Sequence, residues 1–270
     1  MRRIGKLFTM LWHQGYREVL RTLLARGLDR LNADNNDDPA HNGEFALLRA
    51  YLQPDMVVVD AGANLGIWTA QALAFQPSLR IYAFEPVSHI FKALQERFTG
   101  DGRVICTNAA LADYEGESEM YMNGYYAGSN SLFCRRIFSD FIKETVTITS
   151  GDAFVAENHL EAIDFLKLDV EGAEVKVLEG FRQTLNRGQI SLCQVEYGGT
   201  YIDAGVLLRD VFDFAGQVGY GVAKLLPRGL RLLEHYHHAL ESFNYANYLL
   251  YRDARLLPAG FVDKPTNRHV

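Results

Sequence analysis

Short apolar runs alternate with helix-like stretches along most of the chain after Gly43. The runs are rich in β-branched residues, as in buried strands, and the stretches between them repeat with a period near 3.6. We predict strands at 56–60, 80–84, 104–107, 163–168, 190–196, 221–226 and 246–251. We predict helices at 44–52, 65–75, 88–98, 173–185 and 204–217. Such alternation forms a mostly parallel sheet with helices on both faces, an α/β doubly wound fold.

The alternation is interrupted between residues 112 and 162, a stretch longer than a usual crossover. Residues 119–122 and 146–149 alternate with a period of two on either side of an aromatic, Gly/Ser-rich segment at 123–131. We therefore expect a β-rich insert at about 112–162. A substrate lid and a plain structural elaboration are both open for it.

A basic arm precedes this pattern. Residues 1–31 contain seven basic and two acidic residues, with leucines at helical spacing between the arginines. This is typical of a basic amphipathic helix, which would pack on the body or a partner chain, or attach peripherally to an anionic membrane face. The polar stretch 32–39 predicts a boundary. We expect an arm and linker at 1–42 and one α/β domain at 43–270.

Charge and cysteine content restrict the class of protein. The net charge of −6 argues against a nucleic-acid partner held by general electrostatics. The three cysteines, Cys106, Cys134 and Cys193, form no C-x-x-C pair, which fits a reducing compartment. We find no apolar run of about 18 residues and no secretory leader, so we expect a cytoplasmic protein, with peripheral membrane contact as the alternative.

The first two predicted strands end in acids. Asp60 precedes the glycine turn 62–66, and Glu85 ends the next strand, where a carboxylate grips the ribose hydroxyls of a nucleoside ligand. The dinucleotide fingerprint G-x-G-x-x-G is absent, so a pyrophosphate cofactor is disfavoured. A pair of acids suits the sulfonium and ammonium groups of S-adenosylmethionine. Taken singly, either acid is equally compatible with a helix cap or a solvated loop.

Two further segments follow predicted strands. Asn108 and Ala109 open a small-residue turn that leaves room for a flat base, although a turn without a ligand role is a serious alternative. The block 164–174 brings Asp169, Glu171 and Glu174 to the carboxyl edge of the sheet. Clustered acids repel one another, so at least one is expected to have a raised pKa suited to general-base work. Acids that only complement a helix dipole are the alternative.

These motifs together resemble the FkbM family of S-adenosylmethionine-dependent methyltransferases. The resemblance spans about Val57 to Glu196, and its most specific part is K-x-D-V-E-G-x-E at 167–174. It implies a class I, Rossmann-like, seven-stranded sheet, S-adenosylmethionine as cofactor, and methylation of hydroxyl groups, often on sugars of glycans, polysaccharides or glycosylated metabolites. The cofactor-binding residues expected are Asp60, Gly62, Asn64, Gly66, Glu85, Pro86, Asn108, Ala109 and Asp169.

For the reaction we expect an acceptor oxygen held about 3 Å from the methyl carbon while a nearby base takes its proton. Glu171 is the preferred base; the competitors are Asp169, Glu174 and Glu196, with Lys167 as an orienting charge. Mg²⁺ assistance is the mechanistic rival, but we predict no metal site.

Other features and activities carry less weight. The run 235–238, with three histidines, fits an exposed loop or pocket rim better than a metal site, and Trp12 and Trp68 fit packing better than sugar platforms. The remaining alternatives are an O- or N-methyltransferase of a non-sugar small molecule, a catalytically silent adenosyl-binding scaffold, and a dehydrogenase.

Overall fold

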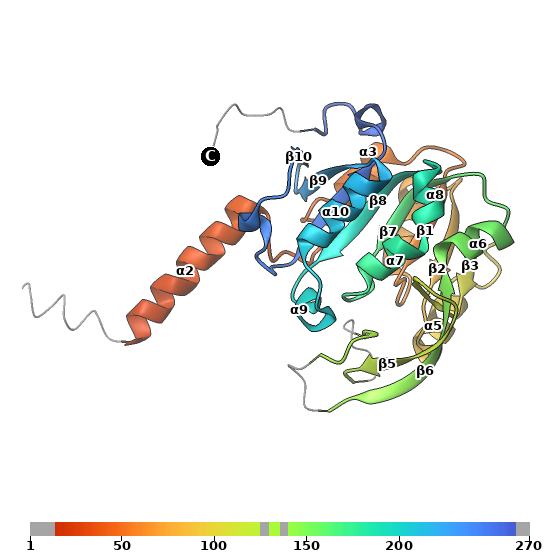
Figure 1. Ribbon diagram of the computed structural model, residues 1–270, viewed down its shortest axis with the longest axis horizontal. Coiled ribbons are helices and arrows are strands. Elements are labelled where there is room, and N and C mark those ends of the chain that lie inside the picture. The colour runs from red at the N-terminus through yellow and green to blue at the C-terminus, as the bar shows by residue number, and fades with distance from the viewer. Residues whose placement is uncertain (1–13, 125–129, 136–139, 263–270) are drawn as a thin grey trace, which may run out of the picture.

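The computed structural model describes residues 14–124, 130–135 and 140–262. It contains two β-sheets, the helices that pack on them, and one projecting helix (Figure 1). The larger sheet has eight strands in the order β10-β9-β11-β8-β7-β1-β2-β3. Its strands are β1 (Val57–Ala61), β2 (Arg80–Phe84), β3 (Val104–Thr107), β7 (Ile163–Leu168), β8 (Ile190–Tyr197), β9 (Gly221–Leu226), β10 (Gly229–Leu233) and β11 (Ala246–Tyr251). Helices lie on both of its faces.

The central strands of this sheet run in one direction. β3, β2, β1, β7 and β8 pair in parallel, whereas β11 is antiparallel to both β8 and β9. Parallel strands place their carboxyl ends at a common edge, where α/β proteins bind ligands. The loops after β1, β2, β7 and β8 therefore converge at one edge.

Alternate strand residues enter two separate apolar cores. Val59 belongs to the core under the later helices, and Val58 belongs to the core on the opposite face. The first core packs α6 (Gly151–Glu157), α7 (Glu174–Gly180), α8 (Arg182–Asn186), α9 (Thr200–Ala204) and α10 (Leu208–Val218). The second packs α3 (Glu44–Tyr51) and α4 (Ile67–Phe75), with Leu94 from α5 (Ser88–Arg97). Fully buried strands of this kind explain the continuous apolar runs in the sequence.

A smaller, three-stranded sheet follows the third parallel strand. It contains β4 (Ala110–Ala112), β5 (Gly116–Met122) and β6 (Ile142–Ser150) in the order β4-β6-β5. Met120 and Ile148 bury their side chains in a third cluster together with Val87 and Ile90, at the start of α5. This sheet therefore packs beside the loop that follows β2.

The pattern missed one strand of the large sheet and merged one pair of helices. β10 pairs with β9 through a two-residue turn at Pro227 and Arg228, so the sheet has eight strands instead of the expected seven. The helix expected at 204–217 is α10, which begins four residues later; the short α9 before it was not predicted, and it ends at Gly205 (φ 71°). The helix expected at 173–185 is α7 and α8, separated at Phe181. Apolar periodicity continues through that junction, which hides the break.

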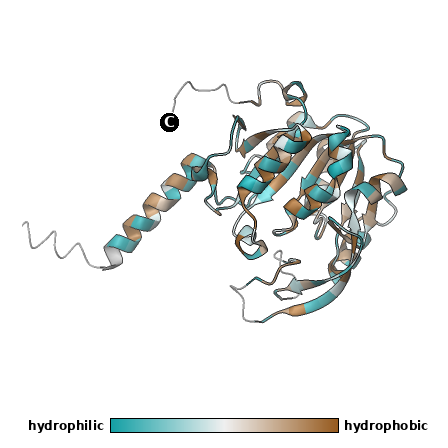
Figure 2. Cartoon of the chain, viewed as in Figure 1, coloured by the Kyte–Doolittle hydropathy of each residue, from teal (hydrophilic) through white to brown (hydrophobic). Residues whose placement is uncertain are grey.

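The basic arm forms α2 (Gln14–Asn32), which projects away from the body (Figure 1). Apolar and polar residues alternate along it (Figure 2), and its leucines are exposed, with Leu28 at a cavity between the helix and the body. Residues 1–13, including Trp12, lie outside the described part. None of the described helices combines the length and the apolar character that crossing a bilayer requires.

Candidate active site

Two cavities meet at the carboxyl edge of the large sheet. The first, called here the narrow cavity, is lined by Gly62, Asn64, Phe84, Glu85, Pro86, Ala109, Ala110, Leu111, Met120, Asn130, Leu132, Asp169, Val170, Glu171 and Ala173. The second, the wide cavity, is lined by Asp37, Pro39, Glu44, Phe45, Gly62, Ala63, Asn64, Leu65, Ile67, Trp68, Arg135, Lys167, Asp169, Glu171, Glu196, Gly198, Gly199, Thr200 and Tyr245. Four residues belong to both: Gly62, Asn64, Asp169 and Glu171.

The glycine turn after β1 forms one wall of the narrow cavity. Gly62 has a φ of 84°, and a Cβ there would lie 1.9 Å from the carbonyl oxygen of Asp169. The amides of Gly62 and Ala63 both donate to the carbonyl oxygen of Phe84, at 3.1 and 2.8 Å. Only glycine permits this approach, so the turn holds the ends of β1, β2 and β7 together.

Glu85 lies at the bottom of the narrow cavity with both oxygens in use. Its Oε2 accepts from the amide of Asn64 at 3.0 Å, and its Oε1 accepts from the amide of Val87 at 2.9 Å. Burial raises the pKa of Glu85 to about 7, and the two amide bonds oppose this rise. Each carboxylate oxygen has a second lone pair, so Glu85 retains the capacity to accept from a ligand hydroxyl.

Lys167 joins two carboxylates, Asp169 at the cavity wall and Asp60 beneath it. Lys167 Nζ lies 2.7 Å from Asp169 Oδ2 and 3.8 Å from Asp60 Oδ1. Asp60 is fully buried and lines neither cavity; its Oδ2 accepts from the hydroxyl of Thr69 at 2.6 Å. Burial raises the pKa of Asp60, and the charge of Lys167 opposes that rise. Asp60 therefore positions Lys167 from below, and it does not contact cavity contents.

Glu171 stands where the two cavities meet, in a left-handed backbone conformation (φ 54°). Its carbonyl oxygen accepts from the hydroxyl of Ser131 at 2.6 Å, and its Oε2 lies 3.6 Å from Arg135 Nη1. Burial, together with the charge of Asp169, raises the pKa of Glu171 to about 8, while Arg135 opposes the rise. A carboxyl group with this pKa can give or take a proton near neutral pH.

The other two acids have different surroundings. Glu174 is buried under the loop, where its carboxylate accepts from the amides of Val170 and Gly172 at 3.0 Å each, and it lines neither cavity. Glu196 lines the wide cavity, and burial with the nearby charges of Asp169 and Glu171 raises its pKa well above the usual value. Glu174 thus shapes the loop, while Glu196 faces the cavity.

Asp169, Glu171 and Glu196 each present a carboxylate oxygen within 4.8 Å of the others. Three such oxygens are suitable ligands for a hard cation such as Mg²⁺. The ammonium of Lys167 already pairs with Asp169, so this group also has an internal source of positive charge.

Two more predicted cofactor residues have structural contacts. Asn108 lines neither cavity; its Nδ2 donates to the carbonyl oxygens of Glu85 and Pro86, at 2.9 Å each. Gly66 begins α4 with a φ of 72°, and a Cβ there would collide with Phe98 and Leu94. The structure therefore brings Gly62, Asn64, Glu85, Pro86, Ala109 and Asp169 to the narrow cavity, and places Asp60, Gly66 and Asn108 behind it.

The sequence pattern did not indicate several residues of the wide cavity. Arg135 comes from the insert, Tyr245 from the stretch before β11, and Asp37 from the linker that we interpreted as a boundary. A signal existed for Gly198 and Gly199, because a glycine pair directly follows the end of β8.

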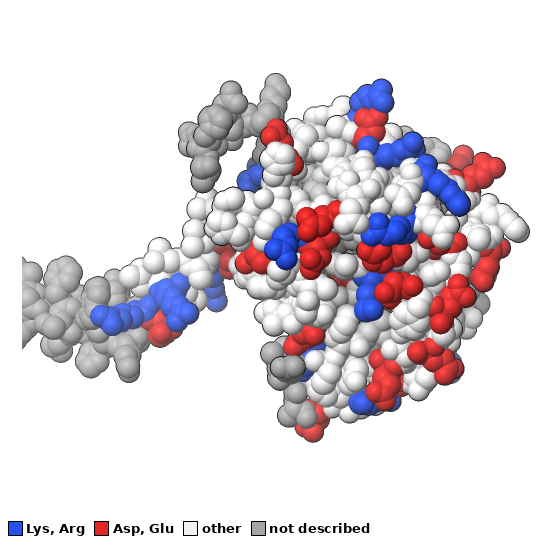
Figure 3. Space-filling view, viewed as in Figure 1, with Lys and Arg blue, Asp and Glu red and all other residues white. Residues whose placement is uncertain are grey.

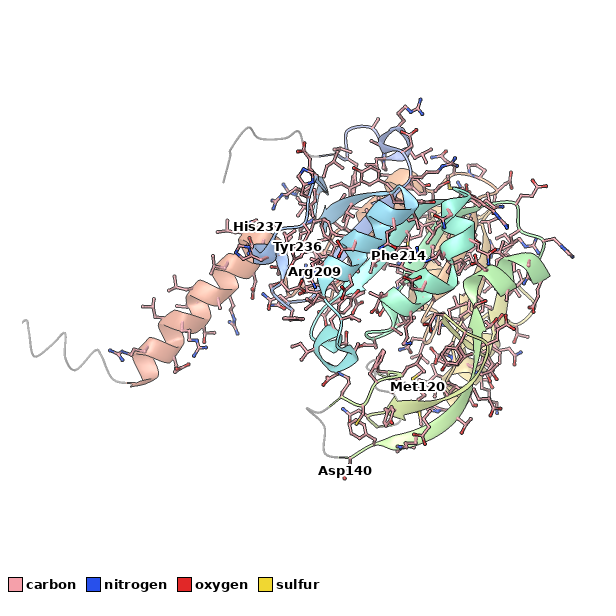
Figure 4. The ribbon with its side chains drawn as sticks, in the orientation of Figure 1. Met120, Asp140, Arg209, Phe214, Tyr236 and His237 are labelled. Carbon is pink, nitrogen blue, oxygen red and sulfur yellow. The ribbon has the colours of Figure 1, made fainter. Side chains whose placement is uncertain are left out.

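The histidines of the run 235–238 lie in an exposed segment, and Trp68 lies between the core and the wide cavity. His235, His237 and His238 are exposed, and Figure 4 places His237 at the root of α2. Among the described residues they belong to no metal-binding group. Trp68 is buried in the second core and also reaches the wide cavity, with Lys167 Nζ 5.6 Å from its ring centre.

This strand order, with β11 reversed between β8 and β9, and the acid-lined cavity at the carboxyl edge define a class I methyltransferase, an enzyme that uses S-adenosylmethionine. Residues 60–248 match the model of the methyltransferase FkbM domain. The chain belongs to the FkbM family of methyltransferases.

Curated relatives are distant. The 2-O-methyltransferase NoeI of Sinorhizobium fredii is 25% identical over 195 residues, which cover 66% of this chain and 77% of NoeI. The hexuronic acid methyltransferase AglP of Haloferax volcanii is 26% identical over 177 residues, covering 62% of this chain and 69% of AglP. The AMB antimetabolite synthetase AmbE of Pseudomonas aeruginosa is 29% identical over 164 residues, and the match spans 8% of AmbE.

Among solved structures, TrmK of M. capricolum in complex with S-adenosyl-homocysteine aligns with a TM-score of 0.42 and 10% sequence identity. The alignment covers 77% of this chain and 67% of that one.

Proposed function

We propose that this methyltransferase transfers the methyl group to a hydroxyl oxygen of a carbohydrate acceptor. One observation carries the proposal: Gly62, Asn64, Asp169 and Glu171 line both cavities. A methyl donor in the narrow cavity and an acceptor in the wide cavity would therefore meet beside Glu171. Holding the methyl donor and the acceptor oxygen close together and aligned is the main requirement of such a transfer.

The narrow cavity fits S-adenosylmethionine in shape and charge. Gly62 lets the turn after β1 pack directly against the carbonyl oxygen of Asp169, so this part of the cavity wall carries no side chain. Glu85 would hold the ribose hydroxyls, and the small Ala109 beside the apolar Leu111 and Leu132 would hold the flat base. Asp169 and Glu171 favour a positively charged end of the ligand. The cofactor supplies an activated methyl group to the acceptor.

The wide cavity suits a hydroxyl-rich acceptor. Its wall carries polar side chains from separate elements, including Asp37, Arg135, Thr200 and Tyr245. Hydroxyl groups both donate and accept, so carboxylates, guanidinium and hydroxyls together match a sugar better than an apolar alcohol. Trp68 adds an apolar surface at the same wall.

We assign the general base to Glu171. It reaches both cavities, and its pKa of about 8 lies near the working range of a base. Asp169 is held by Lys167, and Glu174 is held by main-chain amides, so neither is free for the acceptor proton. Glu196 lines only the wide cavity and is the second candidate.

The names of two relatives support oxygen and carbohydrate as the acceptor. NoeI is a 2-O-methyltransferase, and AglP is a hexuronic acid methyltransferase. Their sequence identities to this chain are 25% and 26%, so the particular sugar must be determined by experiment.

The test is transfer of a labelled methyl group from S-adenosylmethionine to a panel of acceptors. The panel contains free and lipid-linked sugars, non-sugar alcohols and amines, with Glu171→Gln as the matched inactive control. We expect label in sugars as an acid-stable methyl ether, identified by NMR of the product. Label only in amines or non-sugar alcohols, with intact cofactor binding, would overturn the proposal.

A further inference from the structure

We propose that α2 is a membrane-surface helix that lies flat on an anionic lipid bilayer. Six apolar residues of α2 are between 42% and 76% exposed: Val19, Leu20, Leu23, Leu24, Leu28 and Leu31. An exposed row of large apolar side chains is unfavourable in water and marks a contact surface. Most of the helix stands clear of the body (Figures 1 and 2); near its root, Leu28 lines a cavity with Leu233 and Leu240 of the body but is still 59% exposed.

These six residues gather on one side of the helix. With a turn of about 100° per residue, they occupy roughly half of the circumference, centred near Leu20 and Leu23. The opposite half carries Thr22, Glu18 and Asp29. A helix divided into halves in this way matches the boundary between headgroups and acyl chains.

The charges are ordered around this boundary. By the same helical geometry, Arg21 and Arg26 lie just outside the two edges of the apolar face, and Arg17 and Arg30 lie just inside them. Glu18 and Asp29 lie at the middle of the polar face, farthest from the apolar row. When the apolar face is immersed, arginines at the border reach lipid phosphates, while the acids point to water.

The positive charge of α2 contrasts with the negative net charge of the whole chain. The whole sequence has a net charge of −6, whereas α2 contains four arginines and two acids. On the face shown in Figure 3, acidic and basic side chains are mixed over the body. An anionic surface would therefore attract the arm more than the catalytic body.

The same arrangement disfavours a second copy as the occupant. Two such helices pressed together by their apolar faces would place arginines opposite arginines at both borders, in either direction. Of the two acids of α2, Glu18 lies 4.0 Å from Arg21 of the same helix, and Asp29 accepts from Asn244 Nδ2 of the body at 3.5 Å, so neither is directed at a partner helix. Helix pairs gain specificity from opposite charges at these border positions, and like charges there destabilise. Lipid phosphates supply the missing negative charge.

The root of α2 is fixed to the wide cavity. Lys224 and Asp34 form an ion pair in which both side chains are buried, and the amide of Asn35 donates to the carbonyl oxygen of Tyr245 at 2.8 Å. Tyr245 and the neighbouring Asp37 line the wide cavity. A helix seated on lipid would therefore hold this cavity at a set distance from the membrane. This inference does not depend on which acceptor is methylated.

The experiment is co-sedimentation of the full chain with vesicles of phosphatidylcholine alone and with 30% phosphatidylglycerol. We expect binding to the anionic vesicles that weakens at least tenfold on neutral vesicles or in 0.5 M salt, since each arginine near the surface contributes about 1 kcal/mol. The triple variant Leu23→Gln, Leu24→Gln, Leu28→Gln should lose binding. The matched control is Thr22→Gln on the polar face, which should bind as the parent does.

The replaced leucines are exposed, so folding should persist, and circular dichroism with cofactor titration checks this. Equal binding of the triple variant and the parent would overturn the proposal. A concentration-dependent dimer in light scattering that is lost in the triple variant, without vesicle binding by the parent, would also overturn it.

Discussion

Lys167 Nζ lies 2.7 Å from Asp169 Oδ2, with 5% of the lysine side chain exposed. Burial lowers the pKa of such an ammonium, but Asp169, Asp60 and Glu44 outweigh burial and raise it above its usual range. Lys167 is therefore charged at neutral pH. It neutralises acids from β1 and β7 directly beneath the point where the two cavities meet.

Replacing Lys167 should destabilise the fold. Lys167→Met removes the ion-pair partner of Asp169 and Asp60 and leaves these carboxylates without a counter-charge. We expect a loss of about 3–5 kcal/mol in the free energy of unfolding, measured by urea denaturation. Lys143→Met is the matched control, because Lys143 pairs with Glu119 on the surface. Equal unfolding midpoints for the two variants would contradict this prediction.

Glu171→Gln should slow methyl transfer while leaving cofactor binding nearly unchanged. The amide keeps the size of the side chain but cannot take a proton, so we expect kcat to fall about 10²- to 10⁴-fold. The cofactor Kd, measured by calorimetry, should stay within about threefold of wild type, because the amide preserves the cavity wall. Glu117→Gln, an exposed change on β5, is the control. Full activity of Glu171→Gln would show that Glu171 is not the general base and would favour Glu196 in that role.

The rate should depend on pH through Glu171. Burial and Asp169 raise its pKa from 4.5 to about 8, and only the deprotonated carboxylate accepts a proton. We expect kcat/KM to rise about tenfold per pH unit below pH 8 and to level off above it. The profile is measured with saturating cofactor between pH 6 and 9.5. A rate that falls across this range would be incompatible with the assigned role.

Gly62→Ala should lower both the stability of the protein and its affinity for the cofactor. The added Cβ would lie 1.9 Å from the carbonyl oxygen of Asp169, at a φ of 84° that alanine adopts only under strain. The turn must shift, so we expect a lower Tm and a loss of cofactor binding by calorimetry. Gly216→Ala, in α10 with open space around it, should keep binding and the Tm of wild type or slightly above. Undiminished cofactor affinity in Gly62→Ala would refute the tight-turn explanation.

Stability of the cofactor-free protein should fall as pH rises from about 4.5 to 8. Burial raises the pKa of Glu85 and Glu174 to about 7 and that of Glu171 to about 8, above the 4.5 of an unfolded glutamate. The folded state therefore binds protons more tightly than the unfolded chain, so deprotonation across this window opposes folding. Urea midpoints at successive pH values measure the effect. Glu171→Gln should flatten the upper part of the curve, and an unchanged slope would argue against this assignment.

The sequence was sufficient for the parts of the site that follow parallel strands. Gly62, Glu85 and Asp169 were predicted as site residues because strand ends of a parallel sheet meet at one edge. The direction of a side chain could not be predicted in the same way. Asp60 also lies near the carboxyl end of its strand, β1, but its side chain lies below the glycine turn, beside Thr69 and Lys167.

Residues from the insert and the linker could not be predicted, because their position depends on tertiary packing. Arg135 reaches Glu171 from a segment 36 residues away along the chain, and neither residue carries a local pattern that indicates the other. β10 was missed because its strand is short and half exposed, so its apolar pattern is weak.

The buried pair of Asp34 and Lys224 has a consequence for where the enzyme begins. A shortened protein that started at Gly43 would match the alternating pattern of the sequence, yet it would leave the Lys224 ammonium buried without its acid and would lack Asp37 from the cavity wall. A shortened protein should therefore retain Asp34 and Asp37, inside the stretch that looks like a spacer.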